Sequence, residues 1–357
     1  MTGFHEPLQI RAYPLPSSIE PLGALVRIEL AGVCGTDVHL WKGQLPIPCP
    51  IILGHETVGV IEKLGEDLDK DWSGKPLRIG DRITWSAGML CGHCHICTVF
   101  RLPTRCLNRS AYGISFACDK PPHFSGGYAE YIYLRPGTAI FGVSEVSTEA
   151  VIGAGCALVT AIHGIERMGI SFGDSVVIQG SGPVGLAALA IAKSSGASKT
   201  IVIGGPAARL ELSRTFGADQ TIDIDACPDP AVRLDMVREY TAGYGADAVI
   251  ECVGAPGVVS EGLEMCRDGG RYLVLGHYGD AGTAPINPHV ITRKQLTIYG
   301  SWASEPRHMG LAIEFLKKKG ERFPFGQLVS HRFPLDAAFE ALQTTSRWAS
   351  SKSVVVP

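Results

Sequence analysis

Four cysteines lie close together in the sequence and could hold a metal ion. Cys91, Cys94, Cys97 and Cys106 fall within the run CGHCHICTVFRLPTRC. Zinc accepts four thiolates in a tetrahedral shell, and such a closed shell leaves no coordination position open for chemistry. We therefore predict a structural zinc site that fixes a loop. A group of reduced thiols without metal is the alternative interpretation.

A second set of metal-ligand residue types is spread along the chain. Cys34 opens the run CGTDVH, His55 and Glu56 follow Gly54, and Cys156 lies far downstream. Thiolate, imidazole and thiolate form a three-ligand zinc set that leaves a fourth position for water or a substrate. Each element alone is weak evidence, because a lone Cys156 also fits apolar packing and Glu56 also fits a salt bridge.

A glycine-rich turn provides the third chemical signal. The run VVIQGSGPVGL places Gly180, Gly182 and Gly185 in the pattern G-x-G-x-x-G, between an expected strand and an expected helix. The first glycine allows the tight turn, the second lets the backbone approach a pyrophosphate, and the third lets helix and strand pack closely. The helix N-terminus then faces the anion, so we predict a dinucleotide site here.

The residue that usually contacts the ribose of the cofactor is missing from this pattern. An acidic residue is expected about twenty positions after the glycine turn, where it accepts a hydrogen bond from the 2′-hydroxyl. The second strand, KTIVIGG, instead ends in Gly204 and Gly205, and Arg209 is the nearest basic residue. No Ser-Arg pair follows to hold a 2′-phosphate. The expected cofactor is therefore NAD(P), with NAD slightly favoured.

Periodicity indicates the elements that must position these residues. The length of 357 residues exceeds one typical hydrophobic core, so two domains are expected. Up to about residue 150, short runs such as ALVRIEL and DRITWSA alternate with Gly, Pro and Asp, which is typical of a barrel-like β domain. From Ala161 onward, apolar strands alternate with helical runs, which indicates a parallel sheet covered on both faces. One expected helical run is GVVSEGLEMCRDGG, followed by the strand RYLVLGHYG.

Charge and targeting signals disfavour several classes of protein. Lys and Arg total 32 against 35 Asp and Glu, so there is no basic excess to neutralise nucleic acid. The N-terminus lacks a basic region followed by an apolar stretch, and the longest apolar run, Val176–Ala192, is interrupted by Gly and Pro. Eleven cysteines without a secretory signal disfavour a disulfide framework. We expect a soluble cytoplasmic protein that binds neither nucleic acid nor membrane.

Four motifs in register carry a family resemblance. CGTDVH, GHETVGVIEKLG, the four-cysteine lobe and GSGPVG, in this order, resemble the zinc-dependent medium-chain dehydrogenases of the alcohol dehydrogenase type. The resemblance covers almost the whole chain and implies an α/β fold. It implies a GroES-like β-rich catalytic domain at 1–155 with a structural zinc lobe at about 91–106, a Rossmann doubly wound parallel-sheet cofactor domain at 156–298, and a return to the catalytic domain at 299–357.

The resemblance also implies roles for individual residues. Cys34, His55 and Cys156 would hold the catalytic zinc ion, with Glu56 as an adjacent carboxylate that can approach the metal. Asp37 would accept a hydrogen bond from the zinc-bound imidazole and so orient it.

The resemblance further implies that Thr36 and His39 would relay the proton of the alcohol to solvent. The residues that the glycine turn and the resemblance imply for the cofactor are Thr160, Gly180, Gly182, Pro183, Val184, Gly185, Gly204 and Arg209.

The expected reaction is hydride transfer between NAD(P) and an alcohol, with a ketone or aldehyde as its oxidised partner. Trp41, Trp85 and Trp302, together with Thr36, are candidate walls of the pocket, with core packing as the alternative. Large aromatic walls favour a secondary or cyclic alcohol. Polyol and threonine dehydrogenases of this kind carry Glu where Cys156 stands, which argues against those substrates.

Two alternatives stay open at this point. One is a polyol- or threonine-type dehydrogenase of the same family, and the other is a non-catalytic scaffold that binds zinc and cofactor. In either case we expect a homo-oligomer, a dimer or a tetramer, because exposed sheet edges commonly pair across a two-fold axis.

Overall fold

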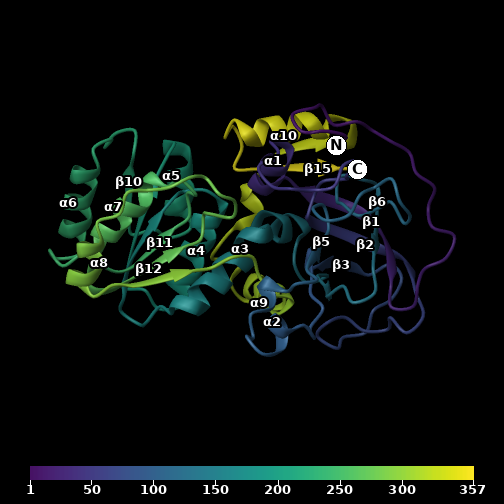
Figure 1. Cartoon of the computed structure of the whole chain (residues 1–357), viewed down its shortest axis with the longest axis horizontal. Helices are drawn as coiled ribbons and strands as arrows, with labels where there is room; N and C mark the ends of the chain where they lie inside the picture. Colours follow the sequence, from purple (N-terminus) through teal and green to yellow (C-terminus); the bar gives the residue numbers. More distant parts are fainter. The chain divides into compact units, whose positions relative to one another are not determined.

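The computed structural model describes all 357 residues and divides into two compact units. The first unit comprises Met1–Cys156 and Ser304–Pro357, and the second comprises Ala157–Ala303. The chain therefore leaves the first unit once and returns to it near its C-terminus (Figure 1).

A seven-stranded sheet forms the framework of the first unit. Its main order is β14-β15-β1-β2-β3-β7, and β6 also pairs with β1. The strands are β1 (Ala24–Gly32), β2 (Glu56–Leu64), β3 (Arg82–Trp85), β6 (Tyr131–Leu134), β7 (Ile140–Gly142), β14 (Val329–Pro334) and β15 (Lys352–Val356). The remaining elements of this unit are α1 (Gly35–Trp41), β4 (Gly88–Met89), α2 (His95–Thr98), the short helix η1 (Pro103–Arg105), β5 (Ser110–Ala111), α9 (Pro306–Lys319), η2 (Phe325–Leu328), η3 (Leu335–Ala337) and α10 (Ala338–Ser346).

The register of this sheet brings three chain segments to one edge. Gly32, the last residue of β1, lies opposite Glu56, the first residue of β2, and β15 pairs with the same end of β1. Cys34 follows this end of β1, His55 precedes β2, and Lys352 begins β15. Residues far apart in the sequence are therefore neighbours at this edge.

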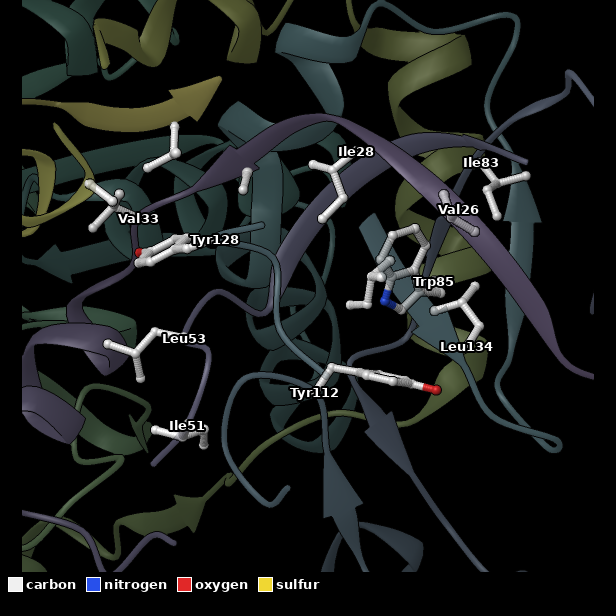
Figure 2. Packing of buried hydrophobic residues seen from close by; sticks show 14 of the residues in the cluster. Val26, Ile28, Val33, Ile51, Leu53, Ile83, Trp85, Tyr112, Tyr128 and Leu134 are labelled. Carbon is white, nitrogen blue, oxygen red and sulfur yellow. The ribbon is translucent and has the colours of Figure 1, made fainter. Parts of the chain in front are cut away.

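Apolar side chains of these strands form the core of the first unit. Figure 2 shows part of this cluster, with Val26, Ile28, Ile83, Trp85 and Leu134 packed together. Ile83 and Trp85 alternate with polar neighbours on β3, so both point inward. Trp85 is only 3% exposed, and the prediction that it lines the substrate pocket is therefore wrong. It fills the core instead.

A six-stranded parallel sheet forms the second unit. Its order β10-β9-β8-β11-β12-β13 is that of a doubly wound dinucleotide-binding sheet, which confirms the expected α/β fold. The strands are β8 (Ser175–Gln179), β9 (Lys199–Gly204), β10 (Gln220–Asp223), β11 (Ala246–Glu251), β12 (Cys266–Val274) and β13 (Thr297–Gly300). The helices are α4 (Pro183–Ser194), α5 (Ala207–Thr215), α6 (Pro230–Tyr240), α7 (Gly257–Met265) and α8 (Pro288–Lys294).

The helix α3 (Thr148–Met168) leads from the first unit into the second. By length and composition it could cross a membrane, with a mean hydropathy of 1.5 in its most apolar window, but 61% of that window is buried inside the protein. Gly155 interrupts it with a non-helical conformation (φ 43°, ψ −146°). The helix is thus mostly covered by the protein's own residues.

The structure differs from the sequence-based expectations in the second unit. The helical run expected at GVVSEGLEMCRDGG ends at Met265, because the chain becomes extended at Cys266 and Gly269 takes a positive φ of 71°. The edge strands β10 and β13 have only four residues each and gave too short a pattern to be recognised. Helix α6 begins with Asp229 as its N-cap and Pro230 in its first turn, a start signal that the sequence does contain.

Candidate active site

The four clustered cysteines converge in the first unit. Their ligand atoms all lie within 4.8 Å of one another. The sulfur of Cys106 is 3.4 Å from that of Cys91 and 3.9 Å from that of Cys94, which in turn is 3.5 Å from that of Cys97. Two thiolates on a tetrahedral zinc ion with Zn–S distances of ~2.3 Å lie about 3.8 Å apart. The cluster therefore fits a closed zinc shell.

The electrostatics of this lobe favour a metal-binding thiolate. A hydrogen bond from the backbone N–H of His93 and a further bond from Asn108 lower the pKa of the Cys91 thiol to about 5. A thiol with such a pKa is deprotonated at neutral pH, and the thiolate is the form that binds metal.

A second cluster gathers Cys34, His55, Glu56 and Cys156, whose ligand atoms also lie within 4.8 Å of one another. The two sulfurs are 3.3 Å apart. The hydrogen bond between the two thiols lowers the pKa of Cys34 well below its usual value and raises that of Cys156. Two soft thiolates and an imidazole are donors suited to zinc.

Asp37 organises the first half of this cluster. Its carboxylate is fully buried, and Oδ2 accepts the backbone N–H of Cys34 at 2.9 Å and the hydroxyl of Tyr128 at 3.1 Å. Oδ1 accepts the backbone N–H of Gly54 at 3.3 Å and lies 3.2 Å from Nδ1 of His55. With Nδ1 donating to Asp37, the neutral imidazole of His55 has on Nε2 the lone pair that a metal requires.

The charge of Asp37 also governs the protonation of its neighbours. Burial alone would lower the pKa of His55, but the negative charge and hydrogen bond of Asp37 outweigh it and raise this pKa well above its usual value. Burial and the same charge raise the pKa of Tyr128, which therefore stays protonated and donates.

Glu56 organises the second half of the cluster. Oε1 accepts the backbone N–H of Cys156 at 2.8 Å, and Oε2 pairs with Nζ of Lys352. Burial would raise the pKa of Glu56, but the charge of Lys352 outweighs it and lowers this pKa to about 2, while the pKa of Lys352 is raised. Both carboxylate oxygens thus have donors from the protein.

Gly155 allows the backbone before Cys156 to lie close to the carboxylate of Glu56. A Cβ atom at this residue would lie 2.4 Å from Oε1 of Glu56 and 3.2 Å from Nζ of Lys352. The positive φ of Gly155 is a second reason why a side chain is disfavoured here. The break in α3 is therefore what presents Cys156 to the buried carboxylate.

The proposed relay residues lie on α1. Thr36 is half-buried and His39, three residues later, is exposed, so the two lie on adjoining turns of one helix face. Nδ1 of His39 pairs with the side-chain oxygen of Gln44. Trp41, at the end of this helix, packs edge-on against Phe339 and donates from Nε1 to the backbone oxygen of Glu6.

The glycine turn has the backbone of a pyrophosphate-binding loop. Gly180 has a φ of 112°, and a Cβ at Gly185 would lie 1.8 Å from the backbone oxygen of Gly180. Gly182 is the N-cap of α4 and has nothing within 4 Å of its missing Cβ, which leaves the approach to the backbone open. Pro183 and Val184 begin α4 and are half-buried.

The other residues predicted for the cofactor also lie in the second unit. Thr160 is half-buried on α3, Gly204 is the buried end of β9, and Arg209 is half-buried on α5, where burial lowers its pKa. Trp302 stacks on Tyr278 with ring centroids 5.3 Å apart.

Sequence reasoning missed two members of the first-unit cluster, Tyr128 and Lys352. Tyr128 stands in the run GGYAEY and Lys352 in SKSVVVP, both of which read only as strands. Nothing in their spacing signals a partner, since Lys352 lies 296 residues from Glu56 and Tyr128 lies 91 residues from Asp37. Only the register of the sheet brings them together.

The chain is similar to known families over both of its units. The alcohol dehydrogenase GroES-like domain matches residues 20–144, and the zinc-binding dehydrogenase domain matches residues 183–318. A curated relative, 5-exo-hydroxycamphor dehydrogenase of Pseudomonas putida, is 38% identical over 94% of this chain and 92% of its own length.

Solved structures show the same similarity. An alcohol dehydrogenase from Thermotoga maritima has a TM-score of 0.94 and 34% identity, covering 100% of this chain and 97% of the other. A putative zinc-binding dehydrogenase from Sinorhizobium meliloti, bound to NADP, has a TM-score of 0.83 and 27% identity, covering 97% and 95% of the two chains.

The first prediction concerns the hydroxyl of Tyr128. Tyr128→Phe removes one donor from the buried Asp37 carboxylate, and partners of this kind around a metal ligand typically change metal affinity by about 10–100-fold. We expect at least the lower end of this range, measured as zinc retention during titration with a chelator. Tyr131→Phe, on the neighbouring strand, is the matched control, and equal zinc retention in both variants would contradict the assigned role.

The second prediction concerns the Glu56–Lys352 pair. Lys352→Met leaves a buried carboxylate without its cation and should cost about 3–5 kcal/mol of unfolding free energy. Adding Glu56→Gln to the same protein removes the unpaired buried carboxylate and should recover most of the lost unfolding free energy. Urea unfolding of the zinc-loaded variants measures both, and a double variant no more stable than the single one would show that the pair is not coupled.

Proposed function

The chain belongs to the zinc-dependent medium-chain dehydrogenases, and from this premise we propose that it interconverts a secondary or cyclic alcohol and its ketone with NAD(P). It is an oxidoreductase of this family. The observation that carries the proposal is the convergence of Cys34, His55 and Cys156 within 4.8 Å, while Glu56 is held by Lys352. That arrangement supports three permanent ligands and one open position.

We assign the catalytic zinc to Cys34, His55 and Cys156, and the structural zinc to the four-cysteine lobe. Bound at the first site, zinc supplies a Lewis acid that favours loss of the hydroxyl proton and polarises a carbonyl group. Asp37 keeps His55 in the tautomer that leaves Nε2 available. Lys352 keeps Glu56 from occupying the open position.

The proton released from the alcohol needs a route to solvent. The hydroxyl of Thr36 can accept and donate a proton, and the exposed imidazole of His39 can exchange it with water. NAD(P) bound in the second unit would supply the hydride acceptor, so oxidation of the alcohol would yield a carbonyl product, the reduced cofactor and one proton.

The cofactor is assigned to the second unit. We propose that the backbone at Gly180, Gly182 and Gly185 and the N-terminus of α4 bind the pyrophosphate. The further contacts that we propose for the cofactor are Thr160, Pro183, Val184, Gly204 and Arg209. On this basis the second unit, residues 157–303, serves as the cofactor domain, and the first unit, residues 1–156 and 304–357, serves as the catalytic domain, close to the bounds expected from the sequence.

Two features favour a bulky cyclic alcohol. The relative from Pseudomonas putida is named for 5-exo-hydroxycamphor, a bicyclic compound with a secondary hydroxyl group. Cys156 supplies a thiolate where polyol and threonine dehydrogenases of this kind carry Glu. Polyols are therefore the second candidate class, and the substrate screen below includes them.

We further propose that the enzyme is a cytoplasmic homo-oligomer. None of the eleven cysteines is in a disulfide, the state that a reducing compartment maintains. Strand β13 is an open edge of the parallel sheet, and its Ile298 is 44% exposed. An exposed apolar edge of this kind suits pairing with a second copy across a two-fold axis.

The third prediction is metal content. The purified enzyme should hold about two zinc ions per chain, one for each cysteine-containing cluster. Cys34→Ser and His55→Ala should each keep the lobe zinc and lose turnover, whereas Cys97→Ser should lose the lobe zinc. Elemental analysis of matched samples distinguishes these cases. One zinc ion in the wild-type chain would favour a scaffold role over catalysis, whereas full activity in His55→Ala would refute the assignment of His55 as a catalytic zinc ligand.

The fourth prediction is substrate preference. In a spectrophotometric screen with NAD and with NADP, bicyclic and cyclic secondary alcohols should give higher kcat/KM than primary alcohols, sorbitol or threonine. The expected margin is about 10–200-fold, the range by which apolar pocket contacts discriminate substrates. A preference for polyols would replace the proposed substrate class by the second candidate.

A further inference from the structure

The position where an acidic residue would normally contact the cofactor ribose is sterically closed in this protein. A Cβ atom on Gly204 would lie 2.5 Å from Oγ and 2.8 Å from the backbone nitrogen of Ser181, which belongs to the glycine turn. The Ser181 hydroxyl also donates to the backbone oxygen of Gly205 at 3.1 Å. A carboxylate cannot be carried by β9 here without displacing the turn that faces the pyrophosphate.

A carboxylate approaches the adjacent residue, Gly205, from the segment that follows the neighbouring strand β10. Oδ2 of Asp225 lies 3.4 Å from the point where Gly205 would carry a Cβ atom, and the side chain of Ile224 lies 3.3 Å from that point. Gly205 directly follows the last residue of β9. The space beside Gly205, the second of two successive glycines, is therefore bordered by a negative charge from the segment after β10.

The backbone holds Asp225 in this position. The N–H of Ile224 donates to the backbone oxygen of Gly204 at 3.0 Å and extends the pairing of β10 with β9. The N–H of Asp225 donates to the Asp223 carboxylate at 2.9 Å, and the N–H of Cys227 donates to the Asp223 backbone oxygen at 2.8 Å. These bonds fix the turn and leave the exposed Asp225 side chain facing the ends of the strands.

We propose that Asp225 accepts the hydrogen bond of the ribose 2′-hydroxyl and makes the enzyme select NAD over NADP. The proposal rests on the dehydrogenase function and deepens it by naming the cofactor. An ionised carboxylate is a strong acceptor for a hydroxyl, whereas a 2′-phosphate brings a second negative charge to the same place. Arg209 is the opposing group, since a guanidinium at the start of α5 attracts a phosphate.

The test compares cofactor binding in the zinc-loaded protein. Dissociation constants of NADH and NADPH are measured by fluorescence titration, which needs no substrate. The wild type should bind NADH about 100-fold more tightly than NADPH. Asp225→Asn, which keeps the size of the side chain and removes its charge, should weaken NADH binding about tenfold and strengthen NADPH binding. Glu239→Gln removes one exposed charge from α6 of the same unit and should leave both constants unchanged.

Two outcomes would overturn the proposal. In the first, the wild type binds NADPH more tightly than NADH, which would make Arg209 the dominant group. In the second, Asp225→Asn changes the dissociation constants of both cofactors equally. A wild type that binds NADH tightly yet oxidises no alcohol refutes the proposed function alone. A wild type that oxidises alcohols with NADP in preference refutes the role of Asp225 alone.

Discussion

Two buried carboxylates hold together the chain segments that carry the candidate zinc ligands. Asp37 joins the segment of Cys34 to that of His55, and Glu56 joins β2 to the broken helix that carries Cys156. A buried charge is costly unless it is fully hydrogen-bonded or paired, so each carboxylate requires its partners to stay in place. The three ligands can therefore converge before any cation arrives, because the protein's own charges already fix their backbones.

The return of the chain to the first unit has a chemical consequence. Strand β15 lies between β14 and β1 in the sheet and also carries Lys352, the cation that pairs with one oxygen of Glu56. Without that cation, a carboxylate next to two thiolates would be a ready fourth ligand for zinc, and a site with four protein ligands has no room for a substrate. The C-terminal segment thus contributes to the reactivity of the site, although none of its residues is a ligand.

The sequence identifies the candidate ligands that converge in the fold, but it misses the side chains that support them. Cys34, His55 and the cysteine lobe could be identified because metals demand particular residue types, and those types are rare enough to stand out. Tyr128 and Lys352 could not, because a hydroxyl or an ammonium group is common in any sequence. Lys352 reaches the cluster through the pairing of β15 with β1, and Tyr128 lies just before β6, which also pairs with β1. Trp85 was misassigned for the related reason that an indole fits a core as well as a pocket.

In the second unit, too, the sequence hides a side chain that a distant segment brings to the candidate cofactor site. The missing acidic residue at Gly204 suggests from the sequence alone that no charge stands near the ribose. In the folded chain the parallel register sets the segment after β10 beside Gly204 and Gly205, and the carboxylate of Asp225 lies next to Gly205, one residue after the position that lacks an acidic side chain. A glycine in a binding motif can therefore mean that a neighbouring strand provides the side chain. The effect of such a glycine on cofactor specificity depends on which side chain the neighbouring segment presents.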